Sequence, residues 1–133
     1  MKNLVVYYSK TGHTRNAAEK VIASLNCDKD EITYDAASKA VTASRNPANY
    51  DRVIVCCPIH AFNLPQPVAL YLTINKDKIK SYSLLVTCRL GGLKSCVANA
   101  TRILGKKPLA SLKINANAIP AGKYDVRPII QSS

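Results

Sequence analysis

Three runs of residues that are apolar on both faces of a strand limit the folds open to this chain. They span residues 4–8, 52–57 and 83–88. A strand with one face in water alternates apolar and polar residues, whereas a strand buried on both faces is apolar nearly throughout. Strands of the second kind occur in parallel sheets that carry helices on both sides. The runs therefore predict an α/β fold.

A segment with apolar residues at helical spacing follows each run. The segment after the second run starts at Pro65-Gln66-Pro67, because proline suits the first turn of a helix. Gly105 is placed to end the third segment. Strands that alternate with helices predict right-handed crossovers between parallel strands. The apolar positions are Ala17, Ala18, Val21, Ile22 and Leu25 in the first helix, Val68, Tyr71 and Leu72 in the second, and Leu93, Cys96, Val97, Ala100, Ile103 and Leu104 in the third.

Two weaker patterns predict the outer strands of the sheet. Residues 31–35 have the pattern of a short strand, and residues 36–49 form at most a weak helix that ends before Pro47. Residues 112–118 alternate strictly, which is the period of a half-exposed strand. Together the elements predict one domain over residues 1–133. Its core is an open parallel sheet with helices on both faces.

The tail predicts a gap in the helical cover of this sheet. Residues 119–133 contain Pro120 and Pro128, so they cannot form a long amphipathic helix, and we expect the last covering helix to be missing. Ile129 and Ile130 either fold back as a partial cover or pack on another subunit. An incomplete cover predicts a homo-oligomer formed through the uncovered sheet face.

Composition and cysteine use predict a soluble cytoplasmic protein. The chain has 133 residues, is 47% hydrophobic and has no apolar run long enough to span a membrane. The N-terminus lacks the layout of a signal peptide. The five cysteines are odd in number and lack CxxC spacing, so we expect buried, reduced thiols and no structural zinc.

The net charge of +11 is concentrated in the second half of the chain. Residues 1–66 hold eight basic and six acidic side chains, whereas residues 67–133 hold eleven basic and two acidic ones. A field of one sign favours an acidic partner protein or nucleic acid. The chain has no Trp and one Phe, so the pattern argues against nucleic acid. A solvated basic face is the simpler interpretation.

The hexapeptide Ser9-Lys10-Thr11-Gly12-His13-Thr14 lies between the first strand and the first helix. A strand that ends in small hydroxyl residues and a glycine directs backbone N–H groups at one point. Those donors, the hydroxyls and the positive end of the helix dipole suit a phosphate. The alternative is an ordinary helix start, in which Thr11 or Thr14 only caps the helix.

Three loops converge on the same edge of the predicted sheet. They are residues 9–14, 58–64 and 89–92, which follow the first, third and fourth strands. In open α/β sheets, ligands bind beyond the carboxyl ends of the strands, where the strand order reverses. The convergence therefore predicts a ligand site whose first loop binds phosphate.

These motifs, in order and at these spacings, resemble the flavodoxin family. The hexapeptide is similar to the S/T-x-T-G-x-T phosphate loop of that family, residues 46–55 resemble its turn before the third strand, and Pro58-Ile59-His60-Ala61-Phe62 is similar to its loop with a flavin-stacking aromatic. The resemblance covers residues 1 to about 115, and it implies a flavodoxin-like open sheet of strand order 2-1-3-4-5 in three α/β/α layers. It implies electron transfer with bound FMN. The implied cofactor-binding residues are Ser9, Lys10, Thr11, Gly12, His13 and Thr14 at the phosphate, and Pro58, Ile59, His60, Ala61, Phe62, Thr87, Cys88, Arg89, Leu90, Gly91 and Gly92 around the ring.

The ring-binding loops depart from the family pattern. His60 stands where a Trp or Tyr usually faces the flavin, and Cys57 stands where a small pair with glycine is usual. No glycine lies between residues 58 and 64, so the loop lacks a freely turning residue. Arg89 and Lys94 lie where the family is typically neutral or acidic. Positive charge near reduced flavin predicts a reduction potential that is high for the family.

Three functions follow from these patterns. The first is a small FMN-binding electron carrier, or the flavin domain of a larger reductase. For this function the net charge of +11 favours an acidic redox partner protein. The second is a degenerate flavodoxin-like module without stable flavin, which acts in interaction or regulation, because the ring-binding loops are depleted. The third is an NAD(P)H-dependent FMN oxidoreductase. The chain is short for a second substrate domain and shows no acid–base pair, so a carrier is favoured over a stand-alone enzyme.

Overall fold

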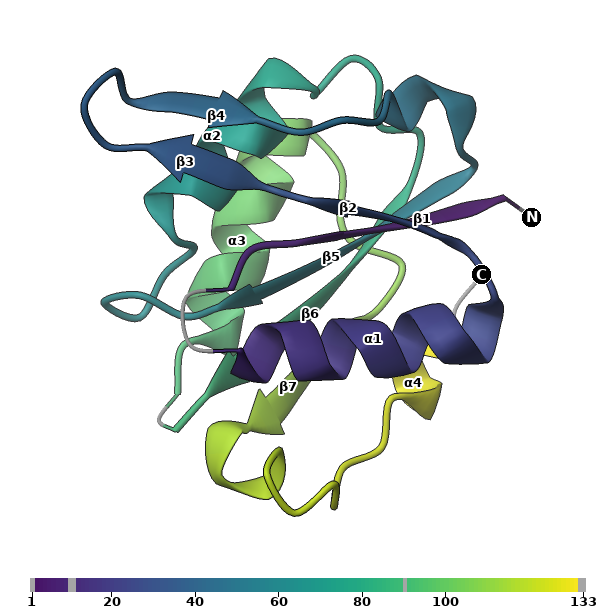
Figure 1. Cartoon of the computed structure of the whole chain (residues 1–133). Helices are drawn as coiled ribbons and strands as arrows, with labels where there is room; N and C mark the ends of the chain where they lie inside the picture. The colour runs from purple at the N-terminus through teal and green to yellow at the C-terminus, as the bar shows by residue number, and fades with distance from the viewer. Residues whose placement is uncertain (1, 10–11, 90, 132–133) are drawn as a thin grey trace.

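Five parallel strands form the sheet at the centre of the molecule (Figure 1). The computed structural model describes residues 2–9, 12–89 and 91–131. Along the sheet the strands stand in the order β2-β1-β5-β6-β7, which is 2-1-3-4-5 when the sheet strands alone are counted. The predicted fold class and strand order are confirmed. The strands are β1 (Asn3–Tyr7), β2 (Asp28–Glu31), β5 (Arg52–Pro58), β6 (Tyr82–Cys88) and β7 (Ser111–Asn115).

Helices cover both faces of the sheet and give three layers (Figure 1). Alternate residues of a strand enter different cores: Val53 and Val55 pack with α2 and α3, whereas Ile54 and Cys56 pack with α1. Both faces are therefore dry, which explains the apolar runs. None of the helices in the described ranges has the length and apolar character needed to cross a bilayer. The helices are α1 (His13–Leu25), α2 (Gln66–Ile74), α3 (Leu93–Leu104) and α4 (Arg127–Ile130).

The second strand does not lie where its pattern placed it. The strand that pairs with β1 is β2, whereas the predicted strand 31–35 runs on into β3 (Thr33–Asp35). Residues 36–49, for which we expected at most a weak helix before Pro47, contain a strand instead: β4 (Ala40–Thr42) pairs antiparallel with β3, and the 3-10 turn η1 (Pro47–Asn49) follows. β2 has the sequence Asp-Lys-Asp-Glu, which has no apolar strand pattern. An edge strand can have such a sequence, since it pairs on one side only and tolerates charged residues.

The tail covers one face of the sheet without a full helix. β7 ends at Asn115, short of the predicted residue 118, because the Asn115 side chain accepts a hydrogen bond from the Asn117 N–H and starts the turn η2 (Ala116–Ala118). The long last helix is absent from the described residues, as predicted. Ile129 is instead fully buried in the core beneath α1, so the tail folds back on its own chain. Homo-oligomer formation stays a prediction, although the face that suggested it is covered.

A buried arginine ties this tail to the sheet. Arg52, at the start of β5, is 2% exposed. Its Nε donates to Asn3 Oδ1 at 2.8 Å, and its Nη1 donates to the Ile129 carbonyl at 3.1 Å. Burial lowers the pKa of the Arg52 guanidinium, but arginine remains charged in proteins, so these acceptors offset its desolvation. The last turn of the tail is therefore held at the amino ends of β1 and β5.

We expect Ile129→Ala to lower the free energy of unfolding by about 2–4 kcal/mol, because it leaves a cavity in a closed core. Ile130→Ala is the matched control, since Ile130 is half-buried one residue further on, and it should lose clearly less. Urea denaturation of the two variants measures the difference. Equal losses would contradict the packing of the tail.

Candidate functional site

Three loops leave the sheet at the carboxyl ends of β1, β5 and β6. The register of these parallel neighbours pairs Tyr7 with Cys56 and Pro58 with Thr87, so the strands end side by side. β1 has β2 on one side and β5 on the other. The connections to the strands on its two sides therefore run in opposite directions along the sheet, and a crevice opens where they part. The predicted convergence of the loops is therefore present in the structure.

Ser9 and Gly12, the described residues of the loop between β1 and α1, shape the start of the helix. Gly12 takes φ +89°, and a Cβ added there would meet nothing within 4 Å. α1 begins at His13, so the N–H groups of its first turn and the positive end of its dipole face this loop. Ser9 Oγ orders the turn by accepting the N–H of Gly12 at 3.0 Å and of Arg15 at 3.4 Å. The predicted binding residues Lys10 and Thr11 lie outside the described residues.

One hydrogen bond joins the first loop to β6. The Oγ1 atoms of Thr14 and Thr87 are 2.7 Å apart, and the two residues are 2% and 4% exposed. The sequence predicts that both contact a ligand. The structure brings them together beneath the crevice, where their hydroxyls bind each other. The pair thus holds the start of α1 against the end of β6.

The loop after β5 makes a tight turn without glycine. The backbones of His60 and Asn63 exchange two hydrogen bonds of 2.8 and 2.9 Å. Between them Ala61 and Phe62 take φ +50° and +61°, a left-handed conformation that costs a non-glycine residue about 1–2 kcal/mol. Strain of this kind gathers at functional sites. The turn leaves Phe62 60% exposed and places His60 edge-on to Tyr8, with ring centroids 6.5 Å apart.

The second and third loops approach each other closely. A Cβ at Gly92 would lie 3.0 Å from Ile59 Cγ2 and 3.2 Å from the Cα of Phe62. Gly92 also takes φ +129°, so its position favours glycine on two grounds. Of the other predicted ring residues, Pro58 belongs to β5, and Leu90 lies outside the described residues. The loops border a hollow of about 280 Å³ lined by Ile59, Ala61, Phe62, Cys88, Arg89 and Gly91.

Basic side chains stand around this part of the crevice. Arg89 lines the hollow, and Lys94 and Lys113 line an adjoining one of about 530 Å³ that shares Phe62 with the first. Burial raises the pKa of the Cys88 thiol, and the nearby Lys113 ammonium opposes that shift. Lys113 is a site residue that the sequence pattern misses. Strand register could have found it, because β7 continues the sheet beside β6.

Asn63 is a second residue that the sequence did not bring into the site. Its Oδ1 accepts the N–H of Leu64 at 2.8 Å and a hydrogen bond from Asn99 Nδ2 at 3.2 Å. Asn99 lies on α3, so Asn63 links the strained turn to that helix. The only signal in the sequence is the preference of asparagine for turns. The link fixes the loop that presents Phe62.

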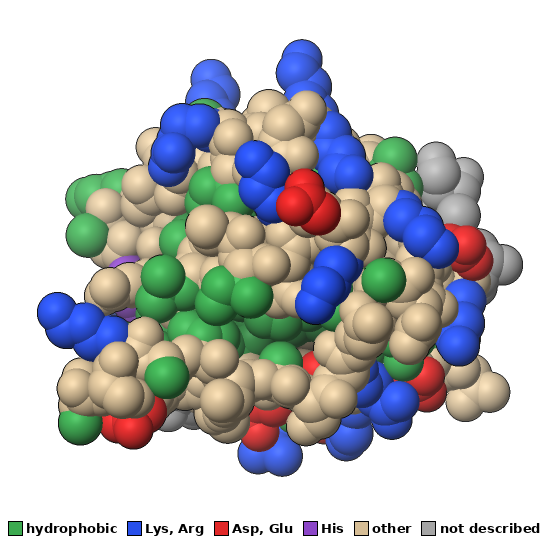
Figure 2. Space-filling model, turned by 90° about the horizontal axis from the view of Figure 1, so that it is seen from above, with side chains coloured by type: hydrophobic (Ala, Val, Ile, Leu, Met, Phe, Trp, Pro, Cys, Tyr) green, Lys and Arg blue, Asp and Glu red, His purple; other side chains and the backbone are tan. Residues whose placement is uncertain are grey.

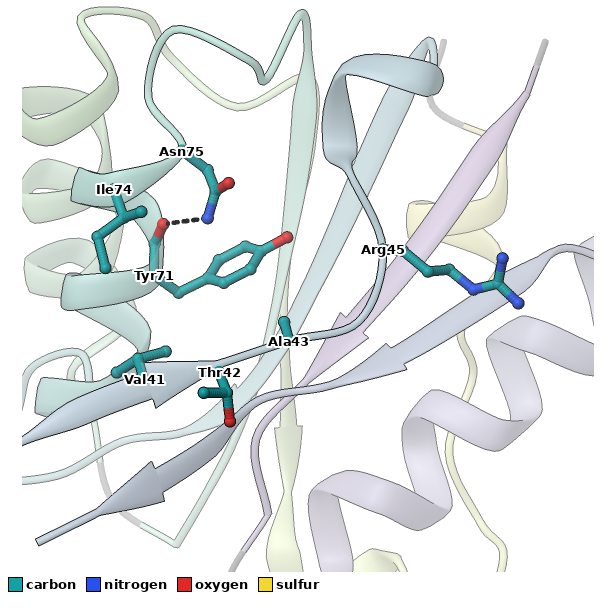
Figure 3. Close-up of a pocket in the computed structure, with 7 residues that line it drawn as sticks. All are labelled: Val41, Thr42, Ala43, Arg45, Tyr71, Ile74 and Asn75. Atoms are coloured by element: carbon teal, nitrogen blue, oxygen red, sulfur yellow. Dashed lines mark hydrogen bonds between the residues drawn. The ribbon is translucent and has the colours of Figure 1, made fainter.

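A different hollow lies between α2 and the β3–β4 hairpin. Figure 2 shows hydrophobic side chains gathered on this face, with Lys and Arg side chains around them. The hollow measures about 250 Å³. Tyr71 reaches from α2 toward the segment with Ala43 (Figure 3), and its buried hydroxyl has no hydrogen-bond partner among the described residues. The Arg45 side chain points away from Tyr71, and its Nη1 lies 3.5 Å from Asp28 Oδ2. The β3–β4 hairpin, which the sequence pattern did not predict, forms one wall of this hollow, and none of the lining residues belongs to the converging loops.

The crevice at the carboxyl ends suits a ligand with a phosphate at one end and a flat ring at the other. The loop at Gly12 offers N–H groups and a positive dipole to an anion. The hollow beside Phe62 offers an exposed aromatic ring, the aliphatic Ile59 and the cation of Arg89. In the described part of the chain, no group of three His, Cys, Asp or Glu side chains could hold a metal ion. The donor set therefore fits a phosphorylated aromatic cofactor.

Comparisons with known proteins agree with this geometry. The family model described as "Flavodoxin domain" matches residues 4–122. A flavoprotein from Lactobacillus acidophilus NCFM, solved in complex with FMN, is 16% identical with TM-score 0.76, over 84% of this chain and 92% of that chain. A flavodoxin from Streptococcus pneumonia TIGR4 is 17% identical with TM-score 0.58, over 86% and 85%. None of the curated proteins matches the sequence. At these identities the likeness to solved structures shows the fold.

We expect Thr14→Val to lower the free energy of unfolding by about 1–2 kcal/mol, because the buried hydroxyl of Thr87 then loses its partner. Thr87→Val should do the same. The double variant should lose less than the sum of the single losses, since neither hydroxyl remains to be satisfied. Denaturant titration of all four proteins measures the coupling. Strictly additive losses would show that the two hydroxyls do not bind each other.

Proposed function

Because the chain belongs to the flavodoxin domain family, we propose that it binds FMN and transfers electrons as a small flavoprotein. The observation that carries this proposal is the turn between β1 and α1. Gly12 there adopts the left-handed conformation that brings the start of α1 toward the point where a phosphate would sit. The FMN complex of the similar Lactobacillus protein supports the choice of cofactor.

The first loop would hold the phosphate of FMN. His13 and Thr14 would contribute backbone N–H groups at the start of α1, and Ser9 and Gly12 would shape the turn that presents them. Lys10 and Thr11 complete the family motif. A dianionic phosphate gains from the helix dipole and from several N–H donors at once. The Thr14–Thr87 bond keeps these donors in place against β6 before the ligand arrives. Phosphate binding is therefore the preorganised part of the site.

The second and third loops would hold the ring. Ile59 and Phe62 offer apolar contact to its face, while Arg89 offers a positive charge to its polar edge. When bound, FMN supplies reversible one- and two-electron chemistry. The protein contributes binding, orientation and the local charge. Phe62 would make the aromatic contact with the ring that the family resemblance implies for this loop, because the ring of His60 packs edge-on against Tyr8.

An electron carrier of the oxidoreductase class fits this site better than a stand-alone enzyme. The described residues that line the ring hollow include neither a histidine nor a carboxylate that could move a proton for a second substrate. Phe62 is 60% exposed, so a partner protein can approach the edge of the hollow. Five free cysteines, three of them buried, suit a reducing compartment, and we place the carrier in the cytoplasm.

We expect the purified protein to take up FMN and show flavin absorbance bands, and Gly12→Ala to weaken FMN binding by about tenfold or more. A Cβ strains the left-handed residue and shifts the loop away from the phosphate. Gly105→Ala is the matched control: Gly105 takes φ +73° with open space around it, and it ends α3. It should lose similar stability and keep its affinity for FMN. Fluorescence titration with FMN measures both.

A colourless protein that takes up no added FMN would overturn the proposal. It would favour the degenerate interaction module, since the phosphate loop would then persist without a bound ring. Equal losses of FMN affinity in Gly12→Ala and Gly105→Ala would show that the phosphate does not bind at the Gly12 turn. Turnover of NADPH with a quinone would favour an enzyme instead.

We expect Arg89→Gln and Lys94→Gln each to lower the reduction potential of bound FMN by roughly 20–40 mV, because each removes a positive charge that favours the more negative, reduced flavin. Lys78→Gln is the matched control, since it makes the same change in net charge in the connection after α2 that leads to the start of β6. Redox titration at low salt measures the three shifts. Identical potentials in all variants would remove the electrostatic argument.

A further inference from the structure

A stretch of 47 residues carries positive charge without any negative charge. Residues 78–124 contain nine Lys or Arg and neither Asp nor Glu. They form β6, α3 and β7, together with the third loop of the crevice. The ion pairs in the described part of the chain lie elsewhere, at Lys29, Arg45 and Arg127. The charges that this stretch contributes to the surface are therefore all of one sign.

Within this basic region, a groove runs along α3 beside the start of β7. We call it the α3 groove, and its volume is about 580 Å³. Its floor includes Leu93, Val97 and Ala98, at helical spacing on one side of α3. Lys94 and Arg102 on α3, with Lys107 just beyond the helix, stand at its rim. An apolar floor inside a cationic rim is the layout of a protein docking surface.

The α3 groove is continuous with the candidate ring site. Leu93 and Lys94 line both the groove and the hollow of about 530 Å³ that Phe62 and Lys113 also line. A molecule seated in the groove therefore lies beside the exposed Phe62. Electron transfer requires close approach to the cofactor and a contact weak enough to release, and small redox interfaces meet both needs.

We propose that the α3 groove docks an acidic partner protein, which places one aliphatic or aromatic side chain on the floor and carboxylates opposite Lys94, Arg102 and Lys107. The redox role of this partner rests on the proposed function, whereas the docking itself does not require flavin. Opposite charges at the rim steer the encounter, and the apolar floor supplies the contact that positions it.

The same residues fit nucleic acid poorly. Binding of single strands uses aromatic side chains as stacking platforms. The aromatic residues in 78–124 are Tyr82, which is 1% exposed, and Tyr124, which holds the Lys20 ammonium over its ring. An apolar floor also has no counterpart on a phosphate backbone. The charge and the groove together therefore favour an acidic protein.

The test uses charge reversal on the purified full chain, with a small, strongly acidic [2Fe–2S] ferredoxin as the probe. Arg102→Glu/Lys107→Glu reverses two rim charges that lie outside the ring hollows. Lys29→Glu/Lys39→Glu is the matched control, with the same change in net charge on exposed residues of β2 and of the β3–β4 hairpin. Calorimetry at low and at physiological salt gives the affinities, and 15N NMR of the wild-type chain maps the contact.

We expect the groove variant to bind the ferredoxin at least about tenfold more weakly than the control variant at low salt, with a smaller difference at high salt. Amide shifts should centre on residues 93–102. Equal weakening in both variants, or shifts spread evenly over the surface, would overturn the groove as the docking site. Tighter binding to a DNA duplex than to the ferredoxin would overturn the choice of an acidic protein.

Docking and flavin binding fail separately in these measurements. A protein that lacks flavin but passes the charge-reversal test keeps the α3 groove as a binding surface and loses the redox role. If the protein binds FMN but the groove variant and the control variant bind the ferredoxin with equal affinity, the carrier function stands and the α3 groove is not the docking surface. Val97→Asp tests the floor: it should weaken the ferredoxin complex further, while circular dichroism shows that α3 is intact.

Discussion

The parallel pairing of β1 with both β2 and β5 is the constraint on which the rest of this molecule depends. Because of this pairing, the chain goes from β1 to β2 on one side and then crosses to β5 on the other side. The crevice opens where these two connections part. Backbone pairing between the strands places the crevice. Side chains at both ends of the strands then hold the covering segments against the sheet. At the carboxyl ends the Thr14–Thr87 bond joins α1 to β6, and at the amino ends Arg52 holds the tail.

The parts that sequence predicts well are those where one physical cause acts alone. The two-faced burial of β5 and β6 leaves apolar runs that are typical of a parallel sheet covered on both sides, and the turn at Gly12 needs a residue that tolerates positive φ. The handedness of crossovers limits the possible topologies, and the family resemblance implies the strand order. The phosphate end of the candidate site was therefore predictable from short local patterns.

The parts that sequence predicts poorly depend on contacts made after folding. The β3–β4 hairpin carries no strong strand pattern, since its residues are mostly exposed and its pairing is local. The left-handed Ala61 and Phe62 contradict local preference and persist because the His60–Asn63 bonds and the contact with Gly92 over-determine them. Lys113 joins the site only through strand register. The shape of the ring site is thus a tertiary property.

The sheet ends at β2 and β7, and both of these edge strands carry charge. β2 has the sequence Asp-Lys-Asp-Glu, and β7 has Lys113 exposed at its middle. An uncharged, flat edge would offer its unpaired backbone groups to the edge of another sheet, and charged side chains oppose that contact. The residues that make β2 hard to predict thus have a purpose of their own: they keep a half-paired strand from recruiting other molecules into a growing aggregate.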